Sequence, residues 1–338
     1  MKREVVISAK DVSIGYPKTR QKDKTCLYNN LSFDLYSGEL VCLIGVNGAG
    51  KSTLLRSISA SQPILNGSIY FKGKDITKYN DKDLSQLLGL VLTDETSVGG
   101  LTVRELVELG RYPYTGFFGQ LSDNDKEVID KAMSDVCIIH KADSYVAELS
   151  DGERQKAMIA KVLAQECPVI LLDEPTAFLD IASRIEIVNL LHNLAMTQNK
   201  TILLSTHDIE LALLLADRLW LLSKEFGLQS GITEDIVLSG LLDNFFQKEN
   251  IVFQKESGSF LPKLECKEKV FLHTQDDIYY WIKNLLSRYG YQLTDNKEDS
   301  SIYLNIQSFK VIEVERDGNK TELSSLSQLV EYLRKHSH

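Results

Sequence analysis

The sequence predicts an α/β fold in which a parallel sheet carries a phosphate-binding loop, followed by a smaller α/β module near the C-terminus. Three observations support this prediction. A glycine-rich loop stands between an apolar run and a helical pattern over residues 40–58. Two further short apolar runs, at 169–172 and 201–204, are followed by acidic or histidine side chains. After about residue 250, a separate alternation of strand and helix patterns begins.

The composition is that of an ordinary globular protein. The chain has 338 residues, enough for two domains or for one large domain with an extension. Its net charge of −9 argues against a nucleic-acid-binding protein, because such proteins usually carry a basic surplus. The five cysteines are odd in number and form no C-x-x-C pair, so we expect free thiols and a reducing compartment.

No segment is predicted to direct the chain to a membrane or to cross one. The N-terminal stretch MKREVVISAK lacks the apolar core of a signal peptide. No apolar run reaches the ~18 residues that a membrane span needs. The richest candidate, residues 211–222, is interrupted by Asp217 and Arg218. We therefore expect a soluble chain that would reach a membrane only through a partner.

The stretch GVNGAGKST, residues 45–53, is the strongest local signal. It fits G-x-x-x-x-G-K-[ST], with a buried-strand pattern before it and apolar residues at helical spacing over 54–58. Glycines let backbone N–H groups turn toward phosphate, and a helix N-terminus favours an anion. We expect Lys51 to reach the β- and γ-phosphates and the Ser52 hydroxyl to hold Mg²⁺. The alternative is an ordinary glycine-rich turn, which would need neither side chain.

Two carboxylates follow the apolar run at 169–172. That run is typical of a parallel strand buried on both faces, and ligands of such sheets bind beyond the carboxyl ends of the strands. Asp173 would support Mg²⁺, and Glu174 would polarise the water that attacks the γ-phosphate. The alternative is a solvated acidic turn before Pro175, which the nearby phosphate loop makes less favoured.

His207 follows the apolar run at 201–204 in the same way. An isolated histidine is usually structural or merely exposed, and that alternative stays open here. At the carboxyl end of a strand beside the phosphate loop, however, an imidazole could contact the γ-phosphate and orient the attacking water.

With these pieces in place, the segment LSDGERQ at 149–155 makes the chain resemble an ATP-binding cassette (ABC) ATPase. Ser150 and Gly152 match the family signature, usually written LSGGQ, whereas Asp151 and Glu153 depart from it. We expect Asp151 to point away from ATP, since a carboxylate near the phosphates would repel them. The signature would open a helix over residues 153–164 whose N-terminus faces a phosphate.

The resemblance covers about residues 1–250 and implies the P-loop NTPase fold. In this fold a RecA-like core carries an antiparallel β subdomain and a helical subdomain, here at about 93–167. The resemblance also implies ATP and Mg²⁺ as cofactors, with Glu174 and His207 as catalytic residues and with Ser52 and Asp173 as Mg²⁺ ligands.

Further residues match ATP contacts of the family. Tyr16 matches the aromatic that stacks on adenine, Asp180 matches the aspartate of the loop after the catalytic glutamate, and His207 matches the switch histidine. The expected ATP-binding residues are Tyr16, Gly45, Asn47, Gly48, Gly50, Lys51, Ser52, Thr53, Ser150, Gly152 and Asp180.

The family mechanism implies partners. Two copies would face each other head to tail and enclose two ATPs, the phosphate loop of one copy meeting Ser150 and Gly152 of the other. The cycle of closing and opening would drive an integral-membrane permease, which places the chain at the cytoplasmic face of a bacterial inner membrane. A separate substrate-binding protein would deliver the cargo, and no nucleic acid is expected.

The segment 102–125, with GRYPY at 110–114, is similar to the importer ATPases for iron–siderophore complexes, haem and cobalamin. Its plain alternative is a turn with aromatic side chains packed under it. The sequence does not say which metal chelate is carried, because the permease and the binding protein choose the cargo.

One position departs from the family. A glutamine that touches Mg²⁺ and the attacking water is expected at Thr93, in GLVLTDETSV. Threonine keeps an oxygen but is two heavy-atom bonds shorter. We therefore expect the contact of Thr93 with the metal to be lost or bridged by water.

Residues 255–338 are predicted to form the accessory α/β domain. A strand at 269–274, strands in SIYLNI and FKVIEVER, and a last helix over 325–336 frame it, with Asp317-Gly318 as a hairpin turn. A helix that ends at Gly290 would present one apolar face. Its residues are Ile278, Trp281, Ile282, Leu285, Leu286 and Tyr289. The domain would be either regulatory or a packing or dimer-stabilising extension, and we favour the extension.

Two other functions remain open at this point. One is a soluble cassette protein acting on nucleic acid or on a non-transport assembly, which the acidic balance disfavours. The other is a nucleotide-binding switch with little hydrolysis, which the presence of Asp173, Glu174 and His207 disfavours.

Overall fold

The computed structural model describes residues 4–18, 25–92, 100–116, 119–246, 251–255, 258–262 and 268–336. The chain divides into two compact units. One comprises Met1–Phe245 with Lys255–Gly258, and the other comprises Phe246–Gln254 with Ser259–His338.

The larger unit is built on a six-stranded sheet with the strand order β10-β9-β3-β8-β7-β6. Strands β9, β3, β8, β7 and β6 run parallel, and β10 pairs with β9 in the antiparallel sense. In chain order the strands are β3 (Leu40–Ile44), β6 (Leu88–Val91), β7 (Val169–Leu172), β8 (Thr201–Thr206), β9 (Arg218–Ser223) and β10 (Gly227–Ile232). β3, β7 and β8 are buried along their whole length, as expected for parallel strands covered on both faces.

The parallel direction decides where the polar residues gather. The chain leaves β3 at Gly45, β7 at Asp173 and β8 at His207. Because these three strands are neighbours and run the same way, their carboxyl ends meet at one edge of the sheet. The predicted phosphate loop, carboxylate pair and histidine are therefore brought together by strand order alone.

A second, antiparallel sheet with the order β2-β1-β4-β5 packs with the first sheet around one apolar core. Its strands are β1 (Val5–Tyr16), β2 (Thr25–Tyr36), β4 (Asn66–Phe71) and β5 (Lys74–Asp75). Helix α1 (Lys51–Ile58) contributes Leu54, Leu55 and Ile58 to that core, and all three are fully buried. The rings of Phe33 and Trp220 join the two sheets with centroids 4.7 Å apart.

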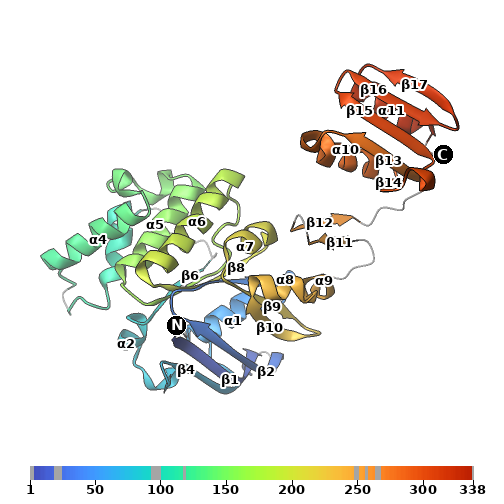
Figure 1. The fold of residues 1–338 in the computed structure, drawn as a ribbon. Helices are drawn as coiled ribbons and strands as arrows, with labels where there is room; N and C mark the ends of the chain where they lie inside the picture. Colours follow the sequence, from blue (N-terminus) through green and yellow to red (C-terminus); the bar gives the residue numbers. More distant parts are fainter. Residues whose placement is uncertain are drawn as a thin grey trace. The chain divides into compact units, whose positions relative to one another are not determined.

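Helices form the rest of the larger unit, and Figure 1 shows α4, α5 and α6 arranged beside one another. The α-helices are α2 (Asp81–Ser85), α3 (Val103–Glu108), α4 (Asp123–Asp135), α5 (Asp151–Ala164), α6 (Ile181–Gln198), α7 (Ile209–Leu215), α8 (Thr233–Leu238) and α9 (Leu241–Phe245). The 3₁₀ turns are η1 (Ile76–Lys78), η2 (Leu109–Arg111), η3 (Ile139–Lys141) and η4 (Val146–Glu148). The helical layer of α3, η2, α4 and α5 precedes β7 in the chain. Among the described residues, no helix combines the length and the apolar character that crossing a membrane requires.

The smaller unit contains a hairpin and a five-stranded sheet with the order β14-β13-β15-β16-β17. Its strands are β11 (Ile251–Gln254), β12 (Ser259–Pro262), β13 (Glu268–Thr274), β14 (Tyr291–Leu293), β15 (Ile302–Ser308), β16 (Val311–Arg316) and β17 (Asn319–Leu323). Its helices are α10 (Asp276–Arg288), η5 (Lys297–Asp299) and α11 (Leu326–His336). Alternate side chains of β13, β15 and β16 share one buried cluster with α10 and α11, so both helices cover the same face of the sheet.

One prediction for this unit is wrong. Ile278, Ile282, Leu285 and Leu286 of α10 lie in the core as expected, but Trp281 is 69% exposed. At 3.6 residues per turn, Trp281 lies about 80° from the centre of the apolar face, at a margin where a side chain need not be covered. It contacts Tyr280 edge-on instead, with centroids 5.5 Å apart.

Two smaller predictions are confirmed. Asp317 and Gly318 have φ angles of 51° and 78°, as a two-residue hairpin turn with both residues left-handed requires. Four cysteines are free thiols, and Cys266 lies outside the described residues. The four are Cys26, Cys42, Cys137 and Cys167.

Candidate functional site

The loop between β3 and α1 has the backbone that close contact with phosphate needs. A Cβ at Gly45 would lie 2.7 Å from the carbonyl oxygen of Leu222, so only glycine fits there. Gly48 and Gly50 have φ angles of 75° and 94°, which side chains disfavour. Gly50 is the N-cap of α1. The loop therefore opens directly into a helix N-terminus.

Lys51 points back over this loop. Its Nζ donates to the carbonyl oxygen of Gly45 at 3.0 Å and lies 3.1 Å from Nε2 of His207. Nζ is also 3.5 Å from Oε1 of Glu174, and the side chain is only 5% exposed. Burial lowers the pKa of Lys51, while the charges of Glu174 and Asp173 oppose that shift. The ammonium group thus stands where an anion in the loop would be its natural partner.

The two carboxylates are held differently. Asp173 is buried, and its Oδ1 accepts a hydrogen bond of 2.7 Å from the hydroxyl of Ser205. The same hydroxyl accepts a 2.8 Å bond from the backbone N–H of Glu174. Glu174 has a φ of 48°, a left-handed conformation that turns its side chain out of the strand direction. Ser205 therefore fixes both members of the pair at once.

Glu174 and His207 contact each other directly. Oε1 of Glu174 lies 2.7 Å from Nε2 of His207, and the two side chains are 31% and 43% exposed. A carboxylate placed between an imidazole and an ammonium group can accept a proton from a water molecule. The neighbouring ammonium can then balance the negative charge that develops on that water. The structure thus brings together four of the predicted residues: Lys51, Asp173, Glu174 and His207.

The signature segment caps a helix. α5 begins at Asp151, two residues before the predicted start, because Ser150 is its N-cap. The Ser150 hydroxyl accepts from the Glu153 N–H at 3.3 Å, and Oε2 of Glu153 accepts from the Ser150 N–H at 3.0 Å. This reciprocal pair is a capping box, which gives the departure from the family at Glu153 a physical reason. Asp151 is exposed and lies 3.2 Å from Arg154.

The remaining predicted ATP contacts lie on other elements. Gly152 sits beside α6, where a Cβ would be 3.2 Å from Oγ of Ser183. Asp180 is the N-cap of α6, and bonds from Ser183 lower its pKa. Tyr16 ends β1 with 54% exposure. In the described part of the chain, the contacts found for Ser150, Gly152 and Asp180 are to α5 and α6 rather than to the phosphate loop.

Three loop residues complete the list of predicted contacts. Asn47 and Gly48 are exposed at the tip of the loop, and Thr53 is buried in the first turn of α1. Ser52 is half-buried beside it. Thr93 lies outside the described residues.

The GRYPY element is organised by an arginine that the sequence reasoning did not single out. Arg111 is 2% exposed. It donates to Asp125 at 2.8 Å, to the carbonyl oxygen of Ala164 at 2.8 Å and to Glu166 at 2.7 Å. Tyr112 is 79% exposed, so the plain alternative, a turn with aromatic side chains packed under it, does not hold for that residue. Beside Arg111, a Cβ at Gly110 would clash with the carbonyl oxygen of Lys161.

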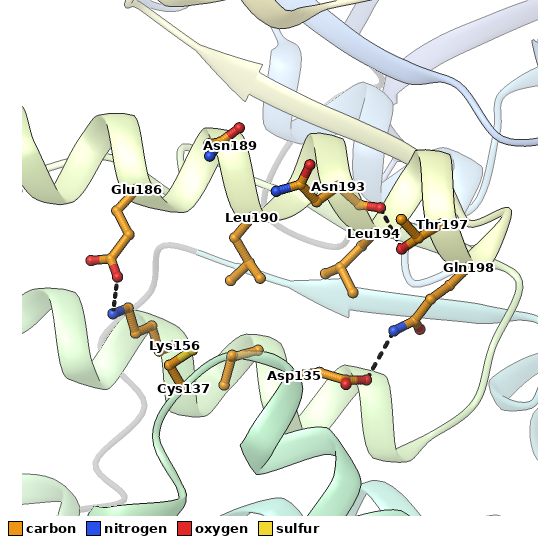
Figure 2. Close-up of a pocket in the computed structure, with 11 residues that line it drawn as sticks. Asp135, Cys137, Lys156, Glu186, Asn189, Leu190, Asn193, Leu194, Thr197 and Gln198 are labelled. Carbon is orange, nitrogen blue, oxygen red and sulfur yellow. Dashed lines mark hydrogen bonds and ion pairs between the residues drawn. The ribbon is translucent and has the colours of Figure 1, made fainter.

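A separate groove of about 340 Å³ lies between the C-terminal end of α4, helix α5 and helix α6. Figure 2 shows two polar contacts that span it, one toward each end. Lys156 lies 2.6 Å from Glu186, and Gln198 donates to Asp135 at 2.9 Å. These contacts join α6 to the helical layer, and the groove contains none of the predicted ATP-binding residues.

Comparison with known proteins places these features in a family. The family model described as "ABC transporter" matches residues 28–177, and the model described as "Iron ABC transporter C-terminal domain" matches residues 266–334. An ABC transporter ATP-binding protein of Methanocaldococcus jannaschii is 36% identical over 255 residues, covering 75% of this chain and 86% of the relative. The ferric enterobactin transport ATP-binding protein of Escherichia coli is 35% identical over 240 residues, covering 71% and 86%.

Solved structures agree. A structure described as a metal-chelate type ABC transporter in an inward-facing conformation matches with a TM-score of 0.63 and 29% identity, covering 77% of this chain and 98% of that one. A dimeric structure of a bacterial ABC transporter cassette matches with a TM-score of 0.59 and 26% identity, covering 67% and 98%. The predicted P-loop NTPase fold is thereby confirmed, and the chain belongs to the ATP-binding, ATP-hydrolysing proteins of ABC transporters.

Proposed function

We propose that this chain hydrolyses ATP to drive import of a metal chelate, with an iron–siderophore complex as cargo, through a separate membrane permease. The observation that carries the ATPase part is the cluster of Lys51, Asp173, Glu174 and His207 at one edge of the sheet. The cargo rests on the ferric enterobactin relative and on the iron-transporter model that matches residues 266–334. Haem and cobalamin importers would use the same ATPase chemistry.

The residues present fit Mg²⁺-ATP. Mg²⁺ is usually held by one or two protein oxygens together with phosphates and water. The Ser52 hydroxyl and the Asp173 carboxylate supply such oxygens, and the described residues hold no cluster of three or more acidic, His or Cys side chains that could bind a metal without phosphate. When bound, the ion would neutralise charge that develops on the phosphates.

The protein side chains would divide the remaining work. Gly45, Gly48 and Gly50 shape the loop around the phosphates, and Lys51 would exchange its carbonyl partner for a phosphate oxygen. Glu174 would accept a proton from the attacking water. His207, already 2.7 Å from that carboxylate, would hold its orientation and contact the γ-phosphate.

The proposed assembly is a head-to-tail pair of cassettes on the permease. Ser150 is exposed at the N-terminus of α5, where a second copy could present ATP. Residues 1–250 would form the cassette, with the helical subdomain at about 93–167, and residues 255–338 the accessory domain. The assembly would sit at the cytoplasmic face of a bacterial inner membrane, where a substrate-binding protein delivers the chelate to the permease.

Substitution of Glu174 by glutamine tests the catalytic assignment. Glutamine keeps the size and one oxygen but cannot accept the proton from water, so phosphate release should fall by at least ~100-fold. ATP-dependent dimerisation, followed by sedimentation, should persist. Glu127→Gln, the same change on the exposed side of α4, should alter neither property. Unchanged turnover in Glu174→Gln would remove Glu174 from the catalytic role.

Co-purification tests the transport part. A tagged chain that recovers an integral-membrane permease supports the proposal. Recovery of nucleic acid without a permease would favour a soluble cassette protein acting elsewhere.

A further inference from the structure

We propose that β17 pairs with β17 of a second copy of this chain, so that two five-stranded C-terminal sheets join into one continuous sheet. The inference rests on the proposed function, because it needs two copies held in one transporter. It assigns the C-terminal module a role as the contact between those copies.

The first observation is that β17 lies at the border of its sheet. Among the described strands, the order ends at β17, which pairs there with β16 alone, and Figure 1 shows it along one side of the module. Its residues Asn319, Lys320 and Glu322 are exposed. A border strand presents a row of backbone N–H and C=O groups that can pair with another chain.

The hairpin turn decides which backbone groups face outward. A two-residue turn with both φ angles positive, as at Asp317-Gly318, is closed by a pair of residues that exchange hydrogen bonds, here Arg316 and Asn319. Antiparallel pairs then alternate along the ladder. Thr321 therefore directs its backbone groups toward β16, and Lys320 and Glu322 direct theirs away from the sheet.

Lys320 and Glu322 carry opposite charges, so each can pair with the other residue in a second copy of the same strand. An antiparallel β17 pair centred on Thr321 places Lys320 opposite Glu322 of the second copy, and Glu322 opposite Lys320 of the second copy. Both are positions where backbone hydrogen bonds can form, so four such bonds accompany two charge pairs.

The charges select this register. If the pair were centred on Lys320, the two Lys320 ammonium groups would lie opposite each other. If it were centred on Glu322, the two Glu322 carboxylates would lie opposite each other. A slip by a single residue would place backbone groups opposite residues that already bond to β16. Among these registers, the one centred on Thr321 satisfies the backbone and also forms both charge pairs.

Lys320 is available for the contact. It is 75% exposed and lies 3.9 Å from Glu315 on the neighbouring strand, a long and solvated ion pair that can rearrange. A five-residue strand pair is weak by itself. Two cassettes fixed to one permease would hold the modules at a high effective concentration, which converts a weak contact into a populated one.

Disulfide trapping tests the pairing in the full-length chain. Thr321 would lie on the two-fold axis in a non-hydrogen-bonded pair, with Cα atoms about 4.5 Å apart, within the range that a disulfide spans. Thr321→Cys, in a background with Cys26, Cys137 and Cys266 changed to Ser, should form linked dimers under mild oxidation. Ser327→Cys, exposed on α11 of the same module, should link at least ~10-fold more slowly.

Two further variants test the register. Glu322→Pro removes an N–H that the register directs away from β16, and a border strand tolerates proline, so it should abolish linking without unfolding the module. Lys320→Glu would place a carboxylate opposite Glu322 of the second copy, and this repulsion should slow linking about tenfold. The double variant Lys320→Glu with Glu322→Lys restores opposite charges and should restore linking. Failure of the exchange to restore linking would overturn the register and with it the proposal.

Sedimentation of Glu174→Gln with ATP measures formation of the cassette dimer independently of the β17 pairing. If that dimer forms while Thr321→Cys links no faster than Ser327→Cys, the strand pairing is overturned and the proposed function stands. If linking occurs without an ATP-dependent dimer, the strand pairing stands and the cassette assignment fails. Slowed hydrogen exchange at Lys320 and Glu322 on adding permease, while Thr321→Cys still links no faster than Ser327→Cys, would assign this edge to the permease and overturn the proposal.

Discussion

Ser205 is the residue on which the geometry of the candidate ATPase site most depends. It is fully buried in β8, yet its hydroxyl joins Asp173 to the backbone of Glu174, both of which follow β7. These two bonds tie the metal-ligand candidate Asp173 to the backbone position that sets the direction of the catalytic candidate Glu174. Because its hydroxyl donates to one of these residues and accepts from the other, we infer that Ser205 positions the carboxylates.

Replacing Ser205 by alanine should therefore reduce turnover more than nucleotide binding. Without the hydroxyl, Asp173 loses one hydrogen bond and the Glu174 N–H loses its partner, so both carboxylates gain freedom. We expect kcat for phosphate release to fall about tenfold to a hundredfold, with a small change in ATP affinity. Steady-state kinetics and nucleotide titration would separate the two effects.

Ser57→Ala is the matched control. Ser57 is equally buried, and its hydroxyl has no hydrogen-bond partner in the described structure. Its removal should leave kcat unchanged and should not lower the free energy of unfolding, because no bond is lost. Equal losses of activity in both variants would show that burial of a serine, rather than its bonds to the carboxylates, is what matters.

The same residues show how far a sequence can predict a site. Lys51 stood out from the phosphate-loop motif, and Asp173, Glu174 and His207 stood out because they follow apolar runs. Parallel strands bring such positions to one edge of the sheet. Ser205 did not stand out, since its role depends on the lateral register of β8 against β7, which no local pattern shows. The contacts proposed for Tyr16, Ser150, Gly152 and Asp180 remain predictions.

At the scale of elements, the helical layer is held together by the buried Arg111 and its ion pairs and hydrogen bond, which we call the Arg111 staple. Arg111 in η2 reaches Asp125 at the start of α4 and the carbonyl oxygen of Ala164 at the end of α5. Gly110 lets η2 approach the backbone of α5 closely. The sequence predicted an element here by family resemblance. Its physical reason, a side chain that satisfies partners on two helices, needed the structure.

Removing this staple should destabilise the cassette. Arg111→Met keeps the apolar stem but leaves the buried carboxylate of Asp125 without its cation, which should lower the free energy of unfolding by about 3 kcal/mol. Arg104→Met is the matched control, because Arg104 is 36% exposed in its pair with Asp130. It should cost less than about 1 kcal/mol. Denaturant unfolding of both variants measures the difference, and equal costs would contradict a structural role for burial.

The same staple predicts a dependence on acid. The hydroxyl of Ser122, followed by its N–H and Arg111, holds the pKa of Asp125 below its ordinary value of 3.8. A carboxyl group whose pKa is lower in the folded state stabilises the fold above the unfolded pKa and loses that contribution as pH falls through the folded pKa. The difference in unfolding free energy between the native chain and Asp125→Asn should be constant above about pH 5 and should shrink below about pH 4. A difference that does not change with pH would contradict this.

At the scale of the whole molecule, the described parts of the larger and smaller units each contain an apolar core, and these two cores share no residue. One lies between the two sheets of the larger unit, and the other lies between the C-terminal sheet and its two helices. The change of pattern near residue 250 predicted a second module, and strand and helix patterns predicted its content. The exposure of Trp281 was not predictable, because an apolar residue at the side of a helical face can be covered or left open by the width of the sheet beneath it.

Separate cores predict separate stability, so damage confined to the C-terminal core should spare the ATPase. Leu329 of α11 is fully buried there, and Leu329→Ala should lower the stability of the module by about 2–5 kcal/mol. Basal phosphate release should stay within about twofold, because none of the predicted catalytic residues lies in that core. The same change at Leu54, fully buried in α1, the helix that follows the phosphate loop, should lower both the stability of the cassette and its turnover. Deleting residues 259–338 should likewise leave basal phosphate release within about twofold. The deletion keeps Lys255, which pairs with Asp243 at 3.6 Å. If either change in the module abolished nucleotide binding in a protein that stays folded, the two cores would not be independent, and the module would have to be counted as part of the ATPase.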